Sequence, residues 1–278
     1  MKKQKARAKA AGKFKTNTEL EWNIVSDGFD SMFVGYRLLE GNFSIRRWAS
    51  SGDLTIIVLD STPFYAESGG QVGDIGLISG DGFSVRVKDV KKDGDTFFHY
   101  CDGFIPESAL DEQVYCKVDD EIRQAIRLNH SATHLMHAAL KDILGEHIQQ
   151  AGSLVCSDYL RFDVTHFEKI TTDELLKIEQ YVNDKIRNNS NVDTEVKGYD
   201  EAKDSGATAL FGEKYGDEVR VVQMGNYSHE LCGGTHVNRT GDIGLFKIIE
   251  ESSLASGVRR LMALTGISAF EFMQNQNS

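Results

Sequence analysis

The fold is decided by residues 119–144, which read DDEIRQAIRLNHSATHLMHAALKDIL and contain neither glycine nor proline. A run of this length without a helix breaker predicts one long helix. Gly145 follows it, and we expect this glycine to end the helix in the left-handed αL conformation. We also expect a second domain, residues 119–278, to begin with this helix.

The residues before the helix have a different pattern. Short β-type runs occupy residues 42–118, and Gly- and Asp-rich clusters at 79–82 and 92–95 separate them as hairpin turns do. The expected strands include 43–48, 54–59, 83–90, 96–101 and 113–118. This pattern predicts a small N-terminal β-barrel over residues 23–118, with a sandwich as the alternative.

The residues after the long helix mix strands with a further helix. Thr171 is followed three residues later by Glu174, a capping box that predicts a helix continuing to about Arg187. The expected strands are 153–156, 159–164, 219–224, 245–250 and 258–265. Because these elements do not alternate as βαβ units, the order predicts an α+β fold rather than a doubly wound sheet.

The charge of the chain is unevenly distributed. Its 278 residues carry a net charge of −11, yet residues 1–15 hold seven lysines and arginines and no acid. Residues 1–22 are therefore predicted to be a basic N-terminal segment, and the chain beyond residue 15 has 24 basic against 42 acidic side chains, a net charge of −18. A body this acidic cannot hold a nucleic acid by bulk electrostatics, so any RNA contact must be local or come from another domain.

The four cysteines are too few for a disulfide framework, and no apolar run approaches the roughly 18 residues of a membrane helix. The basic N-terminus lacks the apolar region of a secretory signal. We therefore expect a cytoplasmic, reduced protein without a membrane partner. Cys101, Cys116 and Cys156 have no partners nearby in the sequence and are expected to be packed inside.

A metal site is predicted by two separated motifs. On a helical wheel His130, His134 and His137 lie opposite the apolar residues Leu128, Ala132, Leu135, Met136, Ala139 and Ile143. The i, i+4 spacing of His130 and His134 aims both imidazoles at one point, and Cys232 and His236 of the CGGTH motif supply a thiolate and a further imidazole. Its paired glycines would allow the backbone to turn tightly. The four side chains form a plausible tetrahedral zinc set, whereas the metalloprotease HExxH and deaminase PCxxC patterns are absent.

Residues 62–74, TPFYAESGGQVGD, form an unusual glycine-rich stretch. They lack the GK[ST] ending of a phosphate-binding loop, and a pair of turns is the simplest interpretation. Alternatively, Gly69 and Gly70 give a backbone surface that a ligand can approach closely, with Glu67 and Gln71 beside them.

Three motifs occur in register: residues 64–74 (FYAESGGQVGD), 129–135 (NHSATHL) and 231–237 (LCGGTHV). Together they resemble the editing region of alanyl-tRNA synthetase, and shorter likenesses at 152–155, 160–163, 209–217 and 257–260 extend the resemblance over about residues 20–275. No stretch resembles the ATP-binding core of a class II synthetase or the C-terminal region of that family. The resemblance therefore implies an internal fragment, with the remainder of the synthetase chain as its partner.

The resemblance implies a zinc-containing editing domain that hydrolyses the ester of Ser-tRNA(Ala) and Gly-tRNA(Ala) and spares Ala-tRNA(Ala). By the same resemblance, Thr133, Gln150 and Ser153 line the catalytic pocket. Glu67, Gly69, Gly70 and Gln71 are candidates for substrate contact. Arg259 and Arg260 would meet a phosphate of the tRNA acceptor end, unless they are a solvated pair at a strand edge.

Two other functions remain open at this point. The editing domain of threonyl-tRNA synthetase shares HxxxH and CxxxH and removes serine from its own tRNA, although the β-rich first domain with Gly69-Gly70-Gln71 argues against it. A non-catalytic zinc module that presents tRNA is the third possibility. The zinc itself either keeps an open catalytic position or is closed by four ligands.

Overall fold

The computed structural model describes residues 20–106, 113–209 and 216–276. Six antiparallel strands form a closed barrel in the order β3 (Glu40–Ser51), β4 (Leu54–Leu59), β8 (Thr96–Asp102), β7 (Phe83–Asp93), β6 (Gly76–Gly80) and β9 (Gln113–Val118). The strand β3 closes it, because its first half pairs with β9 and its second half with β4. Side chains of β9 alternate between exposed and buried, as a barrel wall requires. Short strands β1 (Asn23–Ile24), β2 (Met32–Phe33) and β5 (Ser61–Thr62) flank the barrel.

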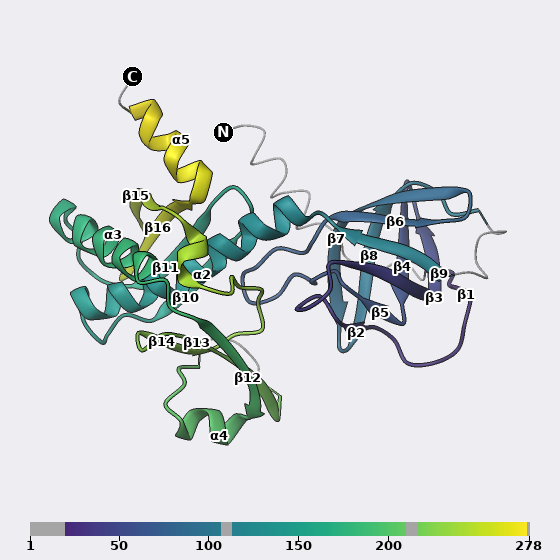
Figure 1. Cartoon of the computed structure of the whole chain (residues 1–278), viewed down its shortest axis with the longest axis horizontal. Coiled ribbons are helices and arrows are strands. Elements are labelled where there is room, and N and C mark those ends of the chain that lie inside the picture. The colour runs from purple at the N-terminus through teal and green to yellow at the C-terminus, as the bar shows by residue number, and fades with distance from the viewer. Residues whose placement is uncertain (1–19, 107–112, 210–215, 277–278) are drawn as a thin grey trace.

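The long helix α2 (Asp120–Leu144) begins beside the barrel and runs into the rest of the molecule (Figure 1). Its N-cap Asp119 accepts a hydrogen bond from the backbone N–H of Ile122, which confirms the predicted start. The predicted αL stop is wrong. Gly145 has φ +116° and ψ 167°, an extended mirror-region conformation, so glycine is still needed there but for a different backbone geometry.

The helix α2 packs on α3 (Thr172–Arg187) and on a four-stranded antiparallel sheet. The sheet order is β10 (Gln150–Val155), β11 (Leu160–Thr165), β16 (Val258–Thr265) and β15 (Phe246–Ala255). Both bonds of the predicted capping box between Thr171 and Glu174 are present. Leu135 and Met136 of α2 meet Phe162, Ile178 and Leu261 in this core, which is separate from the barrel core.

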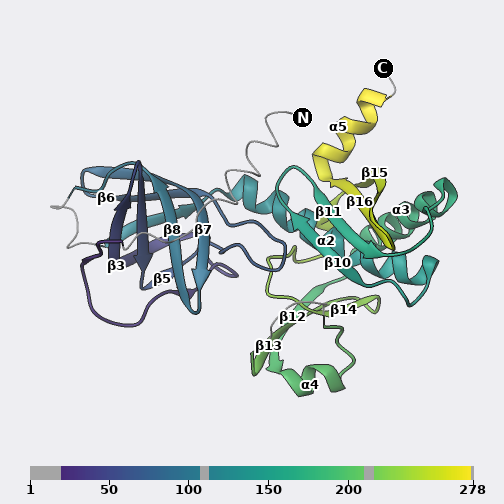
Figure 2. The ribbon, with the colours of Figure 1, turned by 180° about the vertical axis from the view of Figure 1, so that it is seen from behind.

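A smaller lobe holds the three strands β12 (Val192–Gly198), β13 (Glu218–Met224) and β14 (Ser228–Leu231) with the short helix α4 (Tyr199–Asp204), as both views show (Figures 1 and 2). A 3₁₀ turn, η2 (Thr240–Ile243), and a final helix α5 (Gly266–Gln276) complete the described chain. The structure confirms the α+β class with an N-terminal β-barrel. No helix in the described ranges is long and apolar enough to cross a membrane.

We propose the boundary between the two domains at residues 118–119, because the last barrel strand ends at Val118 and α2 begins at Asp120. The predicted basic segment, residues 1–22, lies almost entirely outside the described residues. Cys101 and Cys116 are fully buried in the barrel core, which confirms their packing role, whereas Cys156 is only half-buried.

Candidate metal centre

The four predicted metal ligands converge on one buried point. His130 and His134 come from α2, while Cys232 and His236 come from the loop after β14, and their donor atoms all lie within 4.8 Å of one another. The Cys232 Sγ is 3.5 Å from His130 Nε2 and 3.3 Å from His236 Nε2. A tetrahedral zinc with the usual bond lengths separates sulfur and nitrogen ligands by about 3.5 Å. This cluster can therefore hold a metal ion.

Each imidazole is fixed by a contact to its other nitrogen. His130 Nδ1 is 2.8 Å from Gln71 Oε1, His134 Nδ1 bonds the Glu230 carboxylate, and His236 Nδ1 is 3.3 Å from Ser131 Oγ. The Nε2 atoms consequently face the centre. His134 Nε2 is buried and has no hydrogen-bond partner among the described residues. Since buried polar atoms are nearly always paired, this nitrogen fits a metal ligand.

The electrostatics of the cluster favour a thiolate. Burial opposes ionisation of Cys232, but the imidazoles of His130, His236 and His134 outweigh it and hold the pKa of the thiol well below its usual range. A thiolate with three imidazoles is a donor set that zinc prefers.

Of the two glycines of the CGGTH loop, Gly234 is required by a close approach rather than by a tight turn. Neither Gly233 nor Gly234 has a positive φ. A Cβ on Gly234 would lie only 2.0 Å from His130 Cε1, so a side chain there would displace a ligand. Arg220 fixes the loop by donating to the carbonyls of Cys232 and Gly234, at 3.0 and 2.8 Å.

The glycine-rich barrel loop is built into this centre. Gln71 is fully buried, and its Oε1 accepts a hydrogen bond from the Thr235 backbone N–H at 2.9 Å while contacting His130. Its Nε2 donates to Thr235 Oγ1 at 3.0 Å. Gln71, a candidate for substrate contact, thus has its amide occupied in joining the two halves of the metal centre. The loop is anchored to α2 by Arg123, which is fully buried and bonds the Asp74 carboxylate.

Other members of the predicted site fall in two places. Gly70 has φ +80°, and a Cβ on it would lie 2.8 Å from the Ser153 carbonyl oxygen, so the loop packs tightly on β10. Gly69 lines a small cleft beside the metal ligands. Glu67, in contrast, forms an ion pair with Lys91 of β7.

The small cleft brings the predicted catalytic residues together. Its lining consists of Gly69, His130, Thr133, His134, His137, Gln150, Ser153, Phe162 and Glu230. The Thr133 hydroxyl donates to the carbonyl of Asn129 at 2.9 Å, which leaves its oxygen able to accept. The side chains of Gln150 and Ser153 have no hydrogen-bond partner within the described ranges. They therefore retain both donor and acceptor capacity.

The sequence of this chain is similar to those of known tRNA synthetases. Residues 219–262 match the family model of the threonyl and alanyl tRNA synthetase second additional domain. The chain is 48% identical over 289 residues to the alanine–tRNA ligase of Xanthomonas axonopodis pv. citri, covering 99% of this chain and 32% of the ligase. The ligases of Stenotrophomonas maltophilia and Thermoanaerobacter pseudethanolicus are each 46% identical, over 100% and 99% of this chain and 33% of either ligase.

The chain is an alanyl-tRNA synthetase homologue. It spans about a third of the length of the curated relatives it matches. Residues 1–122 also match the family model of class II (A) tRNA synthetases. Sequence motifs showed no class II ATP-binding core, and this match covers the N-terminal segment and the barrel. Within the motif at 209–217 that resembles the alanyl-tRNA synthetase family, residues 210–215 lie outside the described residues.

Sequence reasoning missed Glu230, which contacts the metal cluster. Its side chain is buried, and its two oxygens bond His134 Nδ1 and His137 Nδ1, the latter at 2.7 Å. Burial raises the pKa of Glu230, but the two histidines outweigh it and hold the carboxylate ionised. A signal was present, because Glu230 lies two positions before Cys232 at the end of β14, and alternate residues of a strand share a face.

The arginines of the synthetase homologue are not arranged as the sequence suggested. The strand β16 lies inside its sheet, so Arg259 and Arg260 are not at an edge. Arg260 makes a bidentate pair with Asp163 at 2.7 and 2.8 Å, and Arg259 pairs with Glu251.

A different set of arginines lines a cavity of about 170 Å³ on the His236 side of the centre, namely Arg37, Arg127 and Arg220. None of the three has a carboxylate partner in the part of the chain that the structure describes. Arg220 stacks on Tyr36 with its guanidinium carbon 4.2 Å from the ring centroid. The Nε of Arg127 is buried and lacks a hydrogen-bond partner among the residues described. This cavity concentrates positive charge on an acidic protein.

Proposed function

We propose that this chain hydrolyses the aminoacyl ester of Ser-tRNA(Ala) and Gly-tRNA(Ala) and spares Ala-tRNA(Ala). In this reaction water adds to the ester carbonyl, and the amino acid and the terminal hydroxyl of the tRNA are released. The observation that carries the proposal is the convergence of Thr133, Gln150 and Ser153 on one cleft beside His130 and His134. Kinship with alanine–tRNA ligases supports tRNA as the substrate and the rest of such a ligase as the partner in cis.

Zinc is the proposed metal, held by His130, His134, Cys232 and His236. When bound, it supplies Lewis acidity toward the ester carbonyl if a coordination position stays open, and a structural tie if all four donors bind it. In either case Gln150 and Ser153 orient the ester in the cleft, because their side chains are free to donate hydrogen bonds to it.

The size and the hydrogen-bonding groups of the cleft suit the removal of serine. An alanine-binding synthetase site rejects serine by only about 10²-fold, so a second site is required. The cleft has an open volume of about 10 Å³, roughly the room for one water molecule, which suits the side chain of serine or glycine. Thr133 Oγ1 accepts a hydrogen bond from the serine hydroxyl, and alanine offers none. Size admits glycine but admits alanine as well, so the bond to the hydroxyl accounts for the selectivity toward serine alone.

The Gln71 contacts favour this function over threonyl-type editing. The barrel loop supplies a side chain that bonds both His130 and Thr235, so the metal centre is built with the barrel. Ser-tRNA(Thr), the substrate of threonyl-type editing, remains the alternative substrate. A non-catalytic zinc module that presents tRNA remains the alternative class of function. The three arginines beside His236 offer the tRNA a local phosphate contact on an otherwise acidic body.

Deacylation by the purified protein tests the proposal. We expect turnover of Ser-tRNA(Ala) and Gly-tRNA(Ala), slower loss of Ala-tRNA(Ala), and little turnover of Ser-tRNA(Thr). A Cys156→Ala variant, altered at a cysteine outside the metal cluster, should match wild type. Faster turnover of Ser-tRNA(Thr) than of Ser-tRNA(Ala) would support the threonyl-type alternative, and no turnover of any substrate would support the presenting module.

A further inference from the structure

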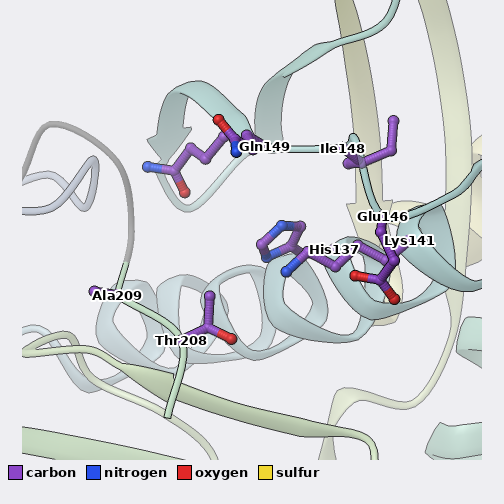
Figure 3. Close-up of a pocket in the computed structure, with 8 residues that line it drawn as sticks. His137, Lys141, Glu146, Ile148, Gln149, Thr208 and Ala209 are labelled. Carbon is purple, nitrogen blue, oxygen red and sulfur yellow. The ribbon is translucent and has the colours of Figure 1, made fainter. Parts of the chain in front are cut away.

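A larger cavity of about 200 Å³ adjoins the small cleft. It is lined by His137, Lys141, Glu146, Ile148, Gln149, Gln150, Thr208 and Ala209 (Figure 3). His137 and Gln150 belong to the walls of both spaces. The two spaces therefore meet at these residues.

His137 brings an unpaired nitrogen to this junction. Its side chain is buried at 3% exposure, and its Nδ1 lies 2.7 Å from Glu230 Oε1. In the neutral imidazole the nitrogen that faces the carboxylate carries the hydrogen, so Nε2 has a lone pair. Nε2 is buried without a partner among the described residues, and Figure 3 shows the imidazole projecting from α2 into the space between Gln149 and Thr208.

If the proposed function holds, the structure of the aminoacyl ester determines which part of the tRNA lies where the two spaces meet. The small cleft has room only for the amino-acid side chain, so the ribose that carries the ester lies just outside it. The free hydroxyl of that ribose is on the carbon next to the one that bears the ester. It consequently falls beside a residue that borders both spaces.

The larger cavity suits the rest of the terminal nucleoside. A cavity of about 150 Å³ is enough for benzene, so 200 Å³ admits a planar heterocycle. Ile148 is fully buried and offers an apolar surface, while Gln149 and Thr208 offer polar edges. Lys141 and Glu146 balance each other in charge, which favours an uncharged nucleoside over a phosphate.

We propose that this cavity receives the terminal nucleoside of the tRNA, and that His137 Nε2 accepts a hydrogen bond from the ribose hydroxyl next to the ester. This inference rests on the proposed function. His137 is thereby a substrate-binding residue, held in place by the same Glu230 carboxylate that orients the metal ligand His134.

A cycle between enzyme and substrate tests the contact. His137→Asn keeps an N–H near the Nδ1 position for Glu230 and removes Nε2. Wild type and variant are each assayed on Ser-tRNA(Ala) with an ordinary terminal ribose and with a terminal deoxyribose that lacks the hydroxyl next to the ester. One hydrogen bond corresponds to a two- to tenfold change in rate. We expect either change alone to slow the reaction by this factor, and both together to slow it no further.

Thr133→Val is the matched control, because its effect should multiply with that of the deoxyribose. Multiplying effects for His137→Asn would overturn the inference while leaving the proposed function intact, whereas a wild type without turnover would remove the function itself. Metal content identical to wild type checks that His137→Asn is folded. If it is not, free adenosine should inhibit the wild type, and Thr208→Phe, which fills the cavity, should abolish this inhibition. A wild type that adenosine does not inhibit, or inhibition that persists in Thr208→Phe, would also overturn the inference.

Discussion

Two groups of buried histidines have opposite surroundings. In the barrel, His99 is fully buried and uses both ring nitrogens, with Nε2 2.7 Å from Thr62 Oγ1 and Nδ1 2.9 Å from the Ile57 carbonyl oxygen. In α2, His134 and His137 use only Nδ1, and each leaves a buried Nε2 without a partner among the residues described. A histidine with a structural role has hydrogen-bond partners within the fold for both ring nitrogens, whereas a histidine that binds a ligand leaves one nitrogen free for it.

The most severe test of this comparison removes the thiolate from the cluster. Cys232→Ala should lower the metal content from one zinc per chain to almost none, because the thiolate is the only anionic donor of the four. Metal binding energy is folding energy, so residues 119–278 should lose cooperative unfolding. Metal analysis and thermal denaturation measure both effects, with Cys156→Ala as the control. A Cys232→Ala protein that keeps its full zinc would break the assignment.

The contribution of His99 to stability should depend on pH and not on the metal. Burial lowers the pKa of His99 to about 4, although its bond to the Ile57 carbonyl raises it. The unfolded chain, with an ordinary histidine pKa, then binds more protons between about pH 6.5 and 4, so stability falls as pH falls through this window. We expect wild type to lose about 2 kcal/mol more than His99→Asn between pH 7 and pH 5.

Urea unfolding at the two pH values measures this difference. His147→Asn, at an exposed histidine, should behave as wild type does. An identical pH dependence in wild type and His99→Asn would show that His99 is not neutral in the fold.

The cleft should discriminate by a single hydroxyl. Ser153→Ala, at a residue that orients the ester, should slow removal of serine and glycine alike. Thr133→Val removes the acceptor of the serine hydroxyl at similar size, which should slow removal of serine by about two- to tenfold. Glycine removal makes no such bond and should change less, so the preference for serine over alanine should shrink. Rates on Ser-, Gly- and Ala-tRNA(Ala) decide it. Equal slowing of serine and glycine by Thr133→Val would assign this residue to the reaction or the fold in general.

The smallest expected effect concerns the arginine cavity. If Arg127 meets one tRNA phosphate, Arg127→Gln should reduce the slope of log affinity against log salt concentration by roughly 0.7 to 1. Filter binding of tRNA across a salt series measures the slope. Arg187→Gln, at an exposed arginine paired with Asp184 on α3, should leave it unchanged. An unaltered slope for Arg127→Gln would exclude the phosphate contact.

The sequence predicted the helices and strands that are set by capping residues, glycines and hydrophobic periodicity. The helix α2, the capping box at Thr171, and the strands β4, β9 and β16 have the predicted bounds to within a residue. The strand β12 was missed because four of its seven residues in succession are exposed and it gains its order from pairing with β13.

The metal ligands could be predicted from spacing, since two of them share a helix face and two flank a glycine pair. Ion pairing could not be predicted. Acidic neighbours in the fold, such as Asp163 and Glu251, decide which arginines have a carboxylate partner. Arg127 was therefore missed, while Arg259 and Arg260 were named as candidates. The close approach of Gly234 to His130 likewise appears only when the barrel loop, α2 and the CGGTH loop are brought together.

We propose that the cluster that holds the unpaired Nε2 of His134 is the hydrolytic centre. The most direct measurement follows the deacylation of Ser-tRNA(Ala) by the wild-type protein as purified, after removal of metal by a chelator, and after zinc is added back. We expect turnover by the protein as purified, a loss of nearly all turnover when the metal is removed, and recovery when one equivalent of zinc per chain is added. Full turnover by the metal-free protein would contradict it.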